Sequence, residues 1–297
     1  MRETDRSFGA VTVLIGAKTG KYPDGNSVVV RGRDAQLLID PSLSVAERAP
    51  ELGCVDLVVQ SHVHEDHVAG LFRFPHAAVH AHRHDVLGLH GLAGLAAIYG
   101  YDGLDAERLR DWVVGAFNYT PRPDAQPYDD AACFDLGGAS VRAIHLPGHT
   151  RGHCALLAEP DGVLFLGDID LSGFGPYYGD AWSDLGDFER SLERVRDLPA
   201  RVWVSFHHVG VLTDRAEFLA KLERFAGRIV QREHALLEFL AVPRSLGELV
   251  AHRFLYPPHA QMAFIDSAER RTIDQHLARL CQRGEVEQCA DEHWRRR

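Results

Sequence analysis

The segment from Gln60 to Leu71 constrains the fold most, because it places several metal-ligand side chains where an apolar run ends. It reads QSHVHEDHVAGL and follows the β-branched run CVDLVVQS. His62 and His64 lie two residues apart, a spacing that points both side chains of an extended strand to one face. Asp66 and His67 follow where a helix is expected to begin, so they turn toward a neighbouring point. One strand end therefore offers four ligand-type side chains, a set that suits zinc and also iron or manganese.

Further ligand-type side chains follow apolar strands later in the chain. His149 comes after the turn in HLPGHT, and Asp168 follows VLFLG. His207 and His208 end the run VWVSFHH, and His207 is preferred because adjacent residues of a strand point to opposite sides. A carboxylate has two oxygens and can bridge two ions, so the whole set predicts a dinuclear site. The predicted ligands are His62, His64, Asp66, His67, His149, Asp168 and His207, with His208 as the alternative to His207.

The remaining histidines are expected to have other roles. His153 in GHTRGH is predicted to form a supporting hydrogen bond near the site. The segment HAAVHAHRHD is interpreted as an ordinary strand and turn, because it has no carboxylate at ligand spacing. The histidines of this segment are His76, His80, His82 and His84.

The loop after Asp168, DLSGFGPYYGDAW, is rich in glycine and aromatic residues. Such a loop can line a substrate cleft, and a self-packed surface loop is the alternative. Tyr177, Tyr178 and Trp182 are the residues predicted to contact a substrate.

Composition excludes several classes of protein. Lys and Arg total 32 against 42 Asp and Glu, a net charge of −10, which argues against a general affinity for nucleic acid. The five cysteines form no C-x-x-C pair, as expected in a reducing compartment. No segment approaches the ~18 to 20 apolar residues of a membrane helix, and the N-terminal residues do not resemble an export signal. A soluble cytoplasmic protein without membrane contacts is therefore expected.

The predicted elements change in character near residue 228. Short strands and turn signals dominate the first part, whereas apolar residues recur at helical spacing after about residue 216. We predict one domain at residues 1–228 and a helical module at 229–297, with the terminal HWRRR as a solvated tail. The module's predicted elements are helices at 216–240 and 266–284, a helix capped by Ser245 and Glu248, and a short β wing at 284–288.

The motifs HVHEDH, PGHT and LGD, followed by a strand-end histidine, resemble the metallo-β-lactamase-fold hydrolases with their pattern H-x-H-x-D-H. The resemblance covers about residues 8–215. It implies an α+β fold, a four-layer αββα sandwich with the metal cleft along one edge of the sheets. One departure is Phe206, which stands where the family usually has a glycine before its last ligand.

The resemblance also implies how the ligands divide. Two divalent ions are expected, most simply Zn²⁺, with iron or manganese as alternatives. The first ion would be held by His62, His64 and His149, and the second by Asp66, His67 and His207, with Asp168 between them. The helical tail resembles the small winged-helix-type module of some members. The alternative is that these helices cover the cleft and help form a homodimer, which the acidic net charge favours.

The expected activity is hydrolysis by a metal-bound hydroxide, with Asp66 and Asp168 as the catalytic carboxylates. A small ester-type substrate, a thioester or a lactone, suits the compact glycine- and tyrosine-rich loop. Three alternatives remain: a phosphodiesterase or endoribonuclease, an iron-dependent persulfide dioxygenase, and a DNA-binding ligand sensor without enzymatic activity. The sensor is disfavoured because unpaired buried imidazoles and carboxylates would be costly without a metal.

Overall fold

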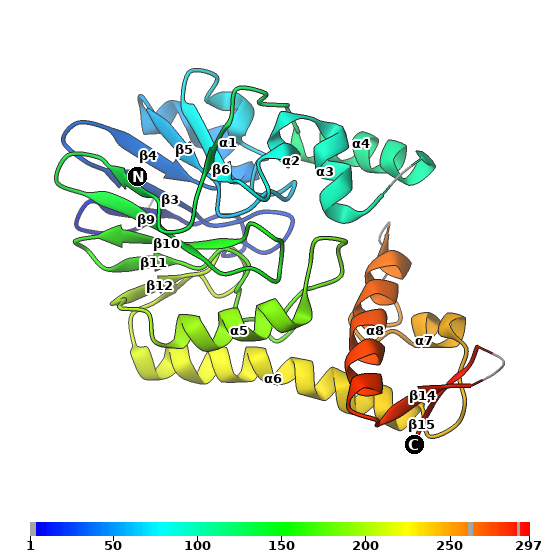
Figure 1. The fold of residues 1–297 in the computed structure, drawn as a ribbon. Helices are drawn as coiled ribbons and strands as arrows, with labels where there is room; N and C mark the ends of the chain where they lie inside the picture. The colour runs from blue at the N-terminus through cyan, green and yellow to red at the C-terminus, as the bar shows by residue number, and fades with distance from the viewer. Residues whose placement is uncertain (1–3, 102, 261–263, 290–291) are drawn as a thin grey trace.

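The computed structural model describes residues 4–101, 103–260, 264–289 and 292–297, and it contains two mixed β-sheets packed face to face (Figure 1). The first sheet contains β1 (Arg6–Phe8), β2 (Val11–Leu14), β3 (Ser27–Arg31), β4 (Gln36–Ile39), β5 (Leu57–Val59), β6 (Ala78–His82) and β7 (Gln126–Tyr128) in chain order. The second contains β13 (Val211–Leu212), β12 (Val202–Val204), β11 (Val163–Phe165), β10 (Cys154–Glu159), β9 (Ser140–His145) and β8 (Cys133–Asp135) in that spatial order.

Both faces of the central strands are buried, which explains why these strands are almost continuously apolar. In β3, Val28 and Val30 point into the core between the sheets. Val29 between them points to the outer face, where it packs in the core under the helices. The alternation follows from the two-residue period of a strand.

Helices cover the outer faces of both sheets, so the layers are helix, sheet, sheet and helix (Figure 1). The predicted sandwich of two mixed sheets and helices is thereby confirmed. The helices on the first sheet are α1 (Leu43–Leu52), α2 (Leu87–His90), α3 (Leu92–Tyr99) and α4 (Gly103–Phe117), with the short 3-10 turn η1 (Leu71–Arg73). Those on the second sheet are α5 (Leu185–Arg196) and α6 (Arg215–Phe239). Within the described residues, every helix is too short or too polar to cross a bilayer.

The strand directions bring the predicted ligands to one edge of the sandwich. Strands β4, β5 and β6 run parallel in the first sheet. In the second sheet β11 is parallel to β12, and β9 runs the same way because β10 is antiparallel to both β9 and β11. The segments that follow β5, β9, β11 and β12 carry the ligand motifs, and they leave the sheets at the same edge.

The C-terminal module continues from α6 without a break. Because α6 runs uninterrupted through Arg228, the predicted domain boundary falls inside a helix. The expected capping box between Ser245 and Glu248 is present. The arginines of HWRRR are exposed, as expected, but the segment is not a free tail, since Trp294–Arg296 pairs with Val286–Gln288 in a small sheet. The module contains α7 (Leu246–His252), α8 (Ile265–Gln282), β14 (Val286–Gln288) and β15 (Trp294–Arg296). Its likeness to a winged helix stays a prediction.

Candidate metal centre

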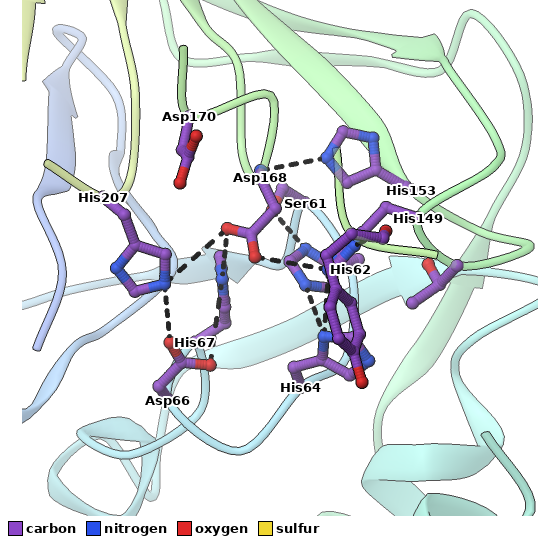
Figure 2. A network of polar contacts seen from close by, with 12 residues as sticks. Ser61, His62, His64, Asp66, His67, His149, His153, Asp168, Asp170 and His207 are labelled. Atoms are coloured by element: carbon purple, nitrogen blue, oxygen red, sulfur yellow. Dashed lines mark hydrogen bonds and ion pairs between the residues drawn. The ribbon is translucent and has the colours of Figure 1, made fainter. Parts of the chain in front are cut away.

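Three histidine nitrogens meet at one point of the sheet edge (Figure 2). His64 Nδ1 lies 3.2 Å from His62 Nε2 and 3.0 Å from His149 Nε2. Asp168 adds an oxygen to this group, with Oδ2 at 3.2 Å from His149 Nε2. These four side chains form the first candidate group for a metal ion.

A second group lies on the other side of Asp168. Asp66 Oδ2 is 2.9 Å from His207 Nε2, and Asp168 Oδ1 is 3.0 Å from His67 Nε2. Asp168 therefore presents one oxygen to each group. The arrangement is consistent with a dinuclear metal site and contains all seven side chains that the sequence predicts.

The outer nitrogens of His62, His67, His149 and His207 have hydrogen-bond partners, which favours their inner nitrogens as acceptors, and that of His64 has an ion-pair contact. A neutral imidazole carries one N–H, and the group that receives it determines which nitrogen keeps a free lone pair. The outer contacts are His62 Nδ1 with Ser61 Oγ at 3.1 Å, His64 Nε2 with Asp180 Oδ2 at 3.2 Å, His67 Nδ1 with Asp40 Oδ2 at 2.7 Å, His149 Nδ1 with Tyr177 O at 2.9 Å, and His207 Nδ1 with Gly20 O and Asp24 O at 3.0 Å.

The inner nitrogens of the first group therefore aim their lone pairs at one another. Three imidazole nitrogens this close together, with an aspartate oxygen beside them, form a donor set that a divalent cation can accept. The donor set fits divalent ions with nitrogen and oxygen ligands, zinc, iron and manganese among them.

The shifted pKa values of the histidines also indicate that the centre favours positive charge. Burial opposes a charge on His67, but Asp168, Asp66 and Asp40 outweigh it and raise the pKa of His67 well above its ordinary value. Burial likewise opposes a charge on His207, yet the same Asp168 and Asp66 raise its pKa to about 9. His62 behaves oppositely, because burial and the neighbouring imidazoles hold its pKa well below the ordinary value. Asp66 and Asp168 therefore favour positive charge on the side chains beside them.

Two buried residues support the centre without joining it. His153 Nε2 accepts a hydrogen bond from the backbone N–H of Asp168 at 3.1 Å, the supporting contact that the sequence predicts. Burial and His149 lower the pKa of His153 to about 3, so this nitrogen stays an acceptor near neutral pH. The ring of Phe206 stacks on His67 with centroids 3.6 Å apart. The residue that departs from the family pattern therefore forms a wall behind a predicted ligand.

The two adjacent histidines at the end of β12 point in different directions. His207 points into the second group, whereas His208 Nε2 lies 3.9 Å from Asp170 Oδ2, outside both groups. The backbone of His208 is left-handed, with φ 58°, which turns its side chain away from that of His207. The structure therefore favours His207, the residue preferred from the sequence, over His208.

A cavity of about 360 Å³ opens beside the two groups. Tyr177 lines it, but Tyr178 and Trp182 do not, so two of the three predicted substrate contacts are misplaced. Tyr178 is fully buried, with its hydroxyl 2.9 Å from His276 Nε2, and Trp182 packs against Arg151. The aromatic residues around the cavity are Tyr22, Tyr99, Tyr101, Trp112, Phe174, Tyr177, Tyr256 and Phe264.

Sequence reasoning missed Asp40 and Glu65. Asp40 follows the apolar strand QLLI, so the strand-end signal that identifies Asp168 also marks Asp40. Glu65 lies inside the HVHEDH motif and faces the cavity, where its carboxylate accepts hydrogen bonds from the hydroxyls of Tyr22 and Tyr99. Neither tyrosine carries a local sequence signal, because both come from distant segments.

A third group of ligand-type side chains lies outside this centre. The sequence offers His82 no carboxylate nearby, but the fold brings Asp130, whose Oδ1 is 2.9 Å from His82 Nε2. His145 joins them, with Nδ1 at 3.3 Å from the same oxygen. His82 Nδ1 accepts from a backbone N–H, so its Nε2 carries the proton and donates to Asp130. This is an ordinary hydrogen bond, as an ordinary strand and turn would have, and His76 and His84 are exposed.

Relatives of known name share parts of this chain. It is 32% identical over 143 residues to an atrochrysone carboxyl ACP thioesterase of Pseudocercospora fijiensis, which is 48% of this chain and 40% of that protein. The chain thus spans less than half the length of that relative. It is 27% identical over 211 residues to an acyl-coenzyme A thioesterase of Gallus gallus, covering 61% of this chain and 70% of the relative.

Whole-chain comparisons agree with the fold. A metallo-beta-lactamase family protein from Thermus thermophilus has a similar structure, with a TM-score of 0.73 and 26% identity over 97% of this chain and 99% of that one. The family model described as Metallo-beta-lactamase superfamily matches residues 22–226, which include all seven predicted ligands. The chain therefore belongs to the metallo-beta-lactamase superfamily.

Proposed function

We propose that the protein is a metal-dependent hydrolase of small ester-type substrates, with a thioester as the first candidate and a lactone as the second. The position of Asp168 carries the proposal: it lies between two groups of ligands, at the wall of the cavity. The names of the two thioesterase relatives support the choice of a thioester.

The residues of the centre divide into those that bind and those that orient. His62, His64 and His149 would hold one ion, Asp66, His67 and His207 the other, and Asp168 would contact both. Bound divalent ions would lower the pKa of water toward neutrality and polarise the carbonyl of the substrate. Asp66 and Asp168 remain ionised, since the neighbouring imidazoles outweigh their burial and lower the pKa of both carboxyls. They act as fixed negative charges that hold the centre together.

The cavity supports a small, uncharged substrate over nucleic acid. Among its described lining residues there is no lysine and no arginine, while Glu65, Asp66, Asp168, Asp170 and Asp180 are all present. A phosphodiester would enter this site without a cationic side chain to contact its phosphates. We accordingly propose a small-molecule substrate and no nucleic-acid partner.

Metal analysis and a substrate panel test the proposal. The purified full-length chain is loaded with Zn²⁺, Mn²⁺ or Fe²⁺ and assayed on a thioester, a lactone, a phosphodiester and glutathione persulfide. We expect two ions per chain and turnover of the thioester or the lactone. One iron per chain with oxygen consumption on the persulfide would instead identify a dioxygenase. Two bound ions with hydrolysis of the phosphodiester alone would identify a phosphodiesterase.

A further inference from the structure

A series of stacked aromatic rings connects the metal centre with the C-terminal module. The ring of His64 stacks on Tyr99 at 5.0 Å and 16°, and Tyr99 stacks on Tyr101 at 5.8 Å and 5°. Tyr101 in turn stacks on Phe264 at 4.2 Å and 23°. All four residues line the cavity. One wall of the cavity is therefore a continuous aromatic surface that begins at a metal ligand and ends at the first turn of α8.

Phe264 is held in this wall in an unfavourable backbone conformation. It precedes α8 with φ 70°, in the left-handed region that aromatic residues rarely adopt. Such a conformation is unfavourable for an aromatic residue and persists only where the surrounding structure enforces it. Because strained residues cluster at ligand sites, the conformation points to a binding role for the Phe264 side chain.

A second residue of the module also contributes to the cavity lining. Tyr256 lines the cavity, with its ring 5.5 Å from that of Phe174. The buried carboxylate of Glu269 accepts hydrogen bonds from the backbone N–H groups of Phe254, Leu255 and Tyr256 at 2.7 to 3.2 Å. A buried charge satisfied by three successive backbone donors fixes this segment, and with it the position of Tyr256.

Hydrogen bonds hold the C-terminal module against the segments that surround the cavity. The side-chain amide of Gln275 in α8 accepts a hydrogen bond from the N–H of Leu185 at 2.6 Å and donates one to the carbonyl of Tyr178 at 2.8 Å. Arg271 donates to the carbonyl of Gly100 at 2.6 Å, next to the aromatic wall. Through these contacts α8 is bound to the segments that surround the site.

We propose that Tyr256 and Phe264 of the C-terminal module form part of the substrate site, and that the substrate carries an uncharged aromatic acyl group. The inference rests on the proposed thioester or lactone hydrolysis. A flat ring would stack on these aromatic side chains, an arrangement that aromatic pairs favour beyond the burial of apolar area. A carboxylate on the same ring would face Glu65 and Asp180 with no described lysine or arginine in the cavity. The cavity volume of about 360 Å³ suits a compact ring system.

Competing thioesters test the inference on the metal-loaded full chain. Three N-acetylcysteamine thioesters share one leaving group and differ in the acyl part, which is acetyl, 2-naphthoyl or 6-carboxy-2-naphthoyl. We expect kcat/KM to be highest for the 2-naphthoyl thioester. It should be at least tenfold higher than kcat/KM for the acetyl thioester and at least tenfold higher than kcat/KM for the 6-carboxy-2-naphthoyl thioester. Equal values for naphthoyl and acetyl, or a preference for the carboxylated ring, would overturn the proposal.

Variants test the role of the module. Phe264→Leu and Tyr256→Leu keep an apolar side chain but remove the ring, and each should lower the naphthoyl-to-acetyl ratio at least fivefold. Phe239→Leu is the matched control, because Phe239 packs in the separate core of the module and does not line the cavity. Melting temperature and metal content show whether each variant is folded. A ratio that neither cavity variant changes would contradict a binding role for Tyr256 and Phe264.

A binding assay separates this inference from the hydrolase proposal. If the metal-loaded chain hydrolyses no thioester or lactone, the proposed function fails, but the cavity can still be titrated with the uncharged ketone 2-acetonaphthone. Quenching of Trp112, which lines the cavity, reports binding. Binding at least fivefold weaker in Phe264→Leu than in Phe239→Leu would support the aromatic site. Equal binding by both variants, or none by the unmodified chain, would overturn it.

Discussion

Asp40 Oδ2 lies 2.7 Å from His67 Nδ1, on the side of the imidazole that faces away from the metal centre. Asp180 Oδ2 has a similar relationship with His64, 3.2 Å from Nε2. One carboxylate thus orients a histidine of the second ligand group, and the other a histidine of the first. Asp40 also accepts a hydrogen bond from Ser61 Oγ, which contacts His62 Nδ1, so Asp40 acts directly on the second group and through Ser61 on the first.

Asp40→Asn should lower the affinity of the second group for metal about 10- to 100-fold, because it removes the charge that orients His67 and makes it more basic. Asp180→Asn should do the same to the first group through His64. Stepwise Zn²⁺ titration against a chelating dye measures each affinity, and circular dichroism checks the fold. If Asp40→Asn and Asp180→Asn had their larger effect on the same step, the division of the ligands into two groups would be wrong.

Replacing Asp168 should affect both groups at once. Asp168→Ala removes a carboxylate that belongs to the first group through Oδ2 and contacts His67 of the second through Oδ1. We expect fewer than one ion per chain by elemental analysis and a fall in kcat/KM of about 10³ or more.

Asp170→Ala is the matched control for that experiment. Asp170 also lines the cavity, but it belongs to neither ligand group and accepts a hydrogen bond from the Ser172 N–H at 2.8 Å. The Asp170→Ala variant should still bind two metal ions per chain. Full turnover by a metal-free Asp168→Ala protein would reject metal-dependent hydrolysis.

The ligands could be predicted from the sequence because strand geometry is regular. Parallel strands end at one edge of a sheet, so a histidine or aspartate just after each apolar run must lie near the others. His149 and Asp168 come together in this way, although the residues next to each of them in the sequence do not indicate that the two side chains meet. The fold class follows from the same pattern of motifs.

The walls of the cavity could not be predicted in this way, because loops and distant segments form them. Tyr177 and Tyr178 are adjacent, and only the loop conformation decides which one faces the cavity. Arg232 of α6 helps set that conformation by donating to the carbonyls of Phe174 and Pro176 at 2.6 and 2.5 Å. No local pattern relates Arg232 to this loop. The same holds for Phe264, which reaches the site only because α8 packs against the sandwich.

His207 and His208 should respond differently to the same substitution. His207→Gln removes a nitrogen that lies 2.9 Å from Asp66 Oδ2, so we expect loss of the second ion and a fall in kcat/KM of about 100-fold or more. His208→Gln should keep both ions and reduce kcat/KM less than tenfold, since His208 lies outside both groups. Metal content and steady-state kinetics of the two variants decide the point. The reverse result would make His208 the seventh ligand.

The contact between the module and the sandwich should depend on pH through Glu233. Its Oε1 lies 2.8 Å from Arg279 Nε, and Arg279 also contacts Glu189 of α5 at 2.7 Å. Burial would raise the pKa of Glu233, but His276 and Arg279 outweigh it and lower the pKa to about 2 from its ordinary value of 4.5.

A depressed folded-state pKa means that the ionised form stabilises the protein above pH 4.5, and that this stabilisation is lost as the pH falls toward 2. Glu233→Gln should therefore lower the free energy of unfolding by about 1.5–3 kcal/mol at pH 7, the range for hydrogen bonds to charged groups. The difference from the unmodified protein should shrink steadily below pH 4.5. Urea unfolding at pH 7, 5 and 3.5 measures it, with Glu238→Gln on the exposed side of the same helix as the control. A difference that stays constant across these pH values would show that the Glu233 carboxylate is not held ionised by its partners, and that packing alone connects α8 to α6.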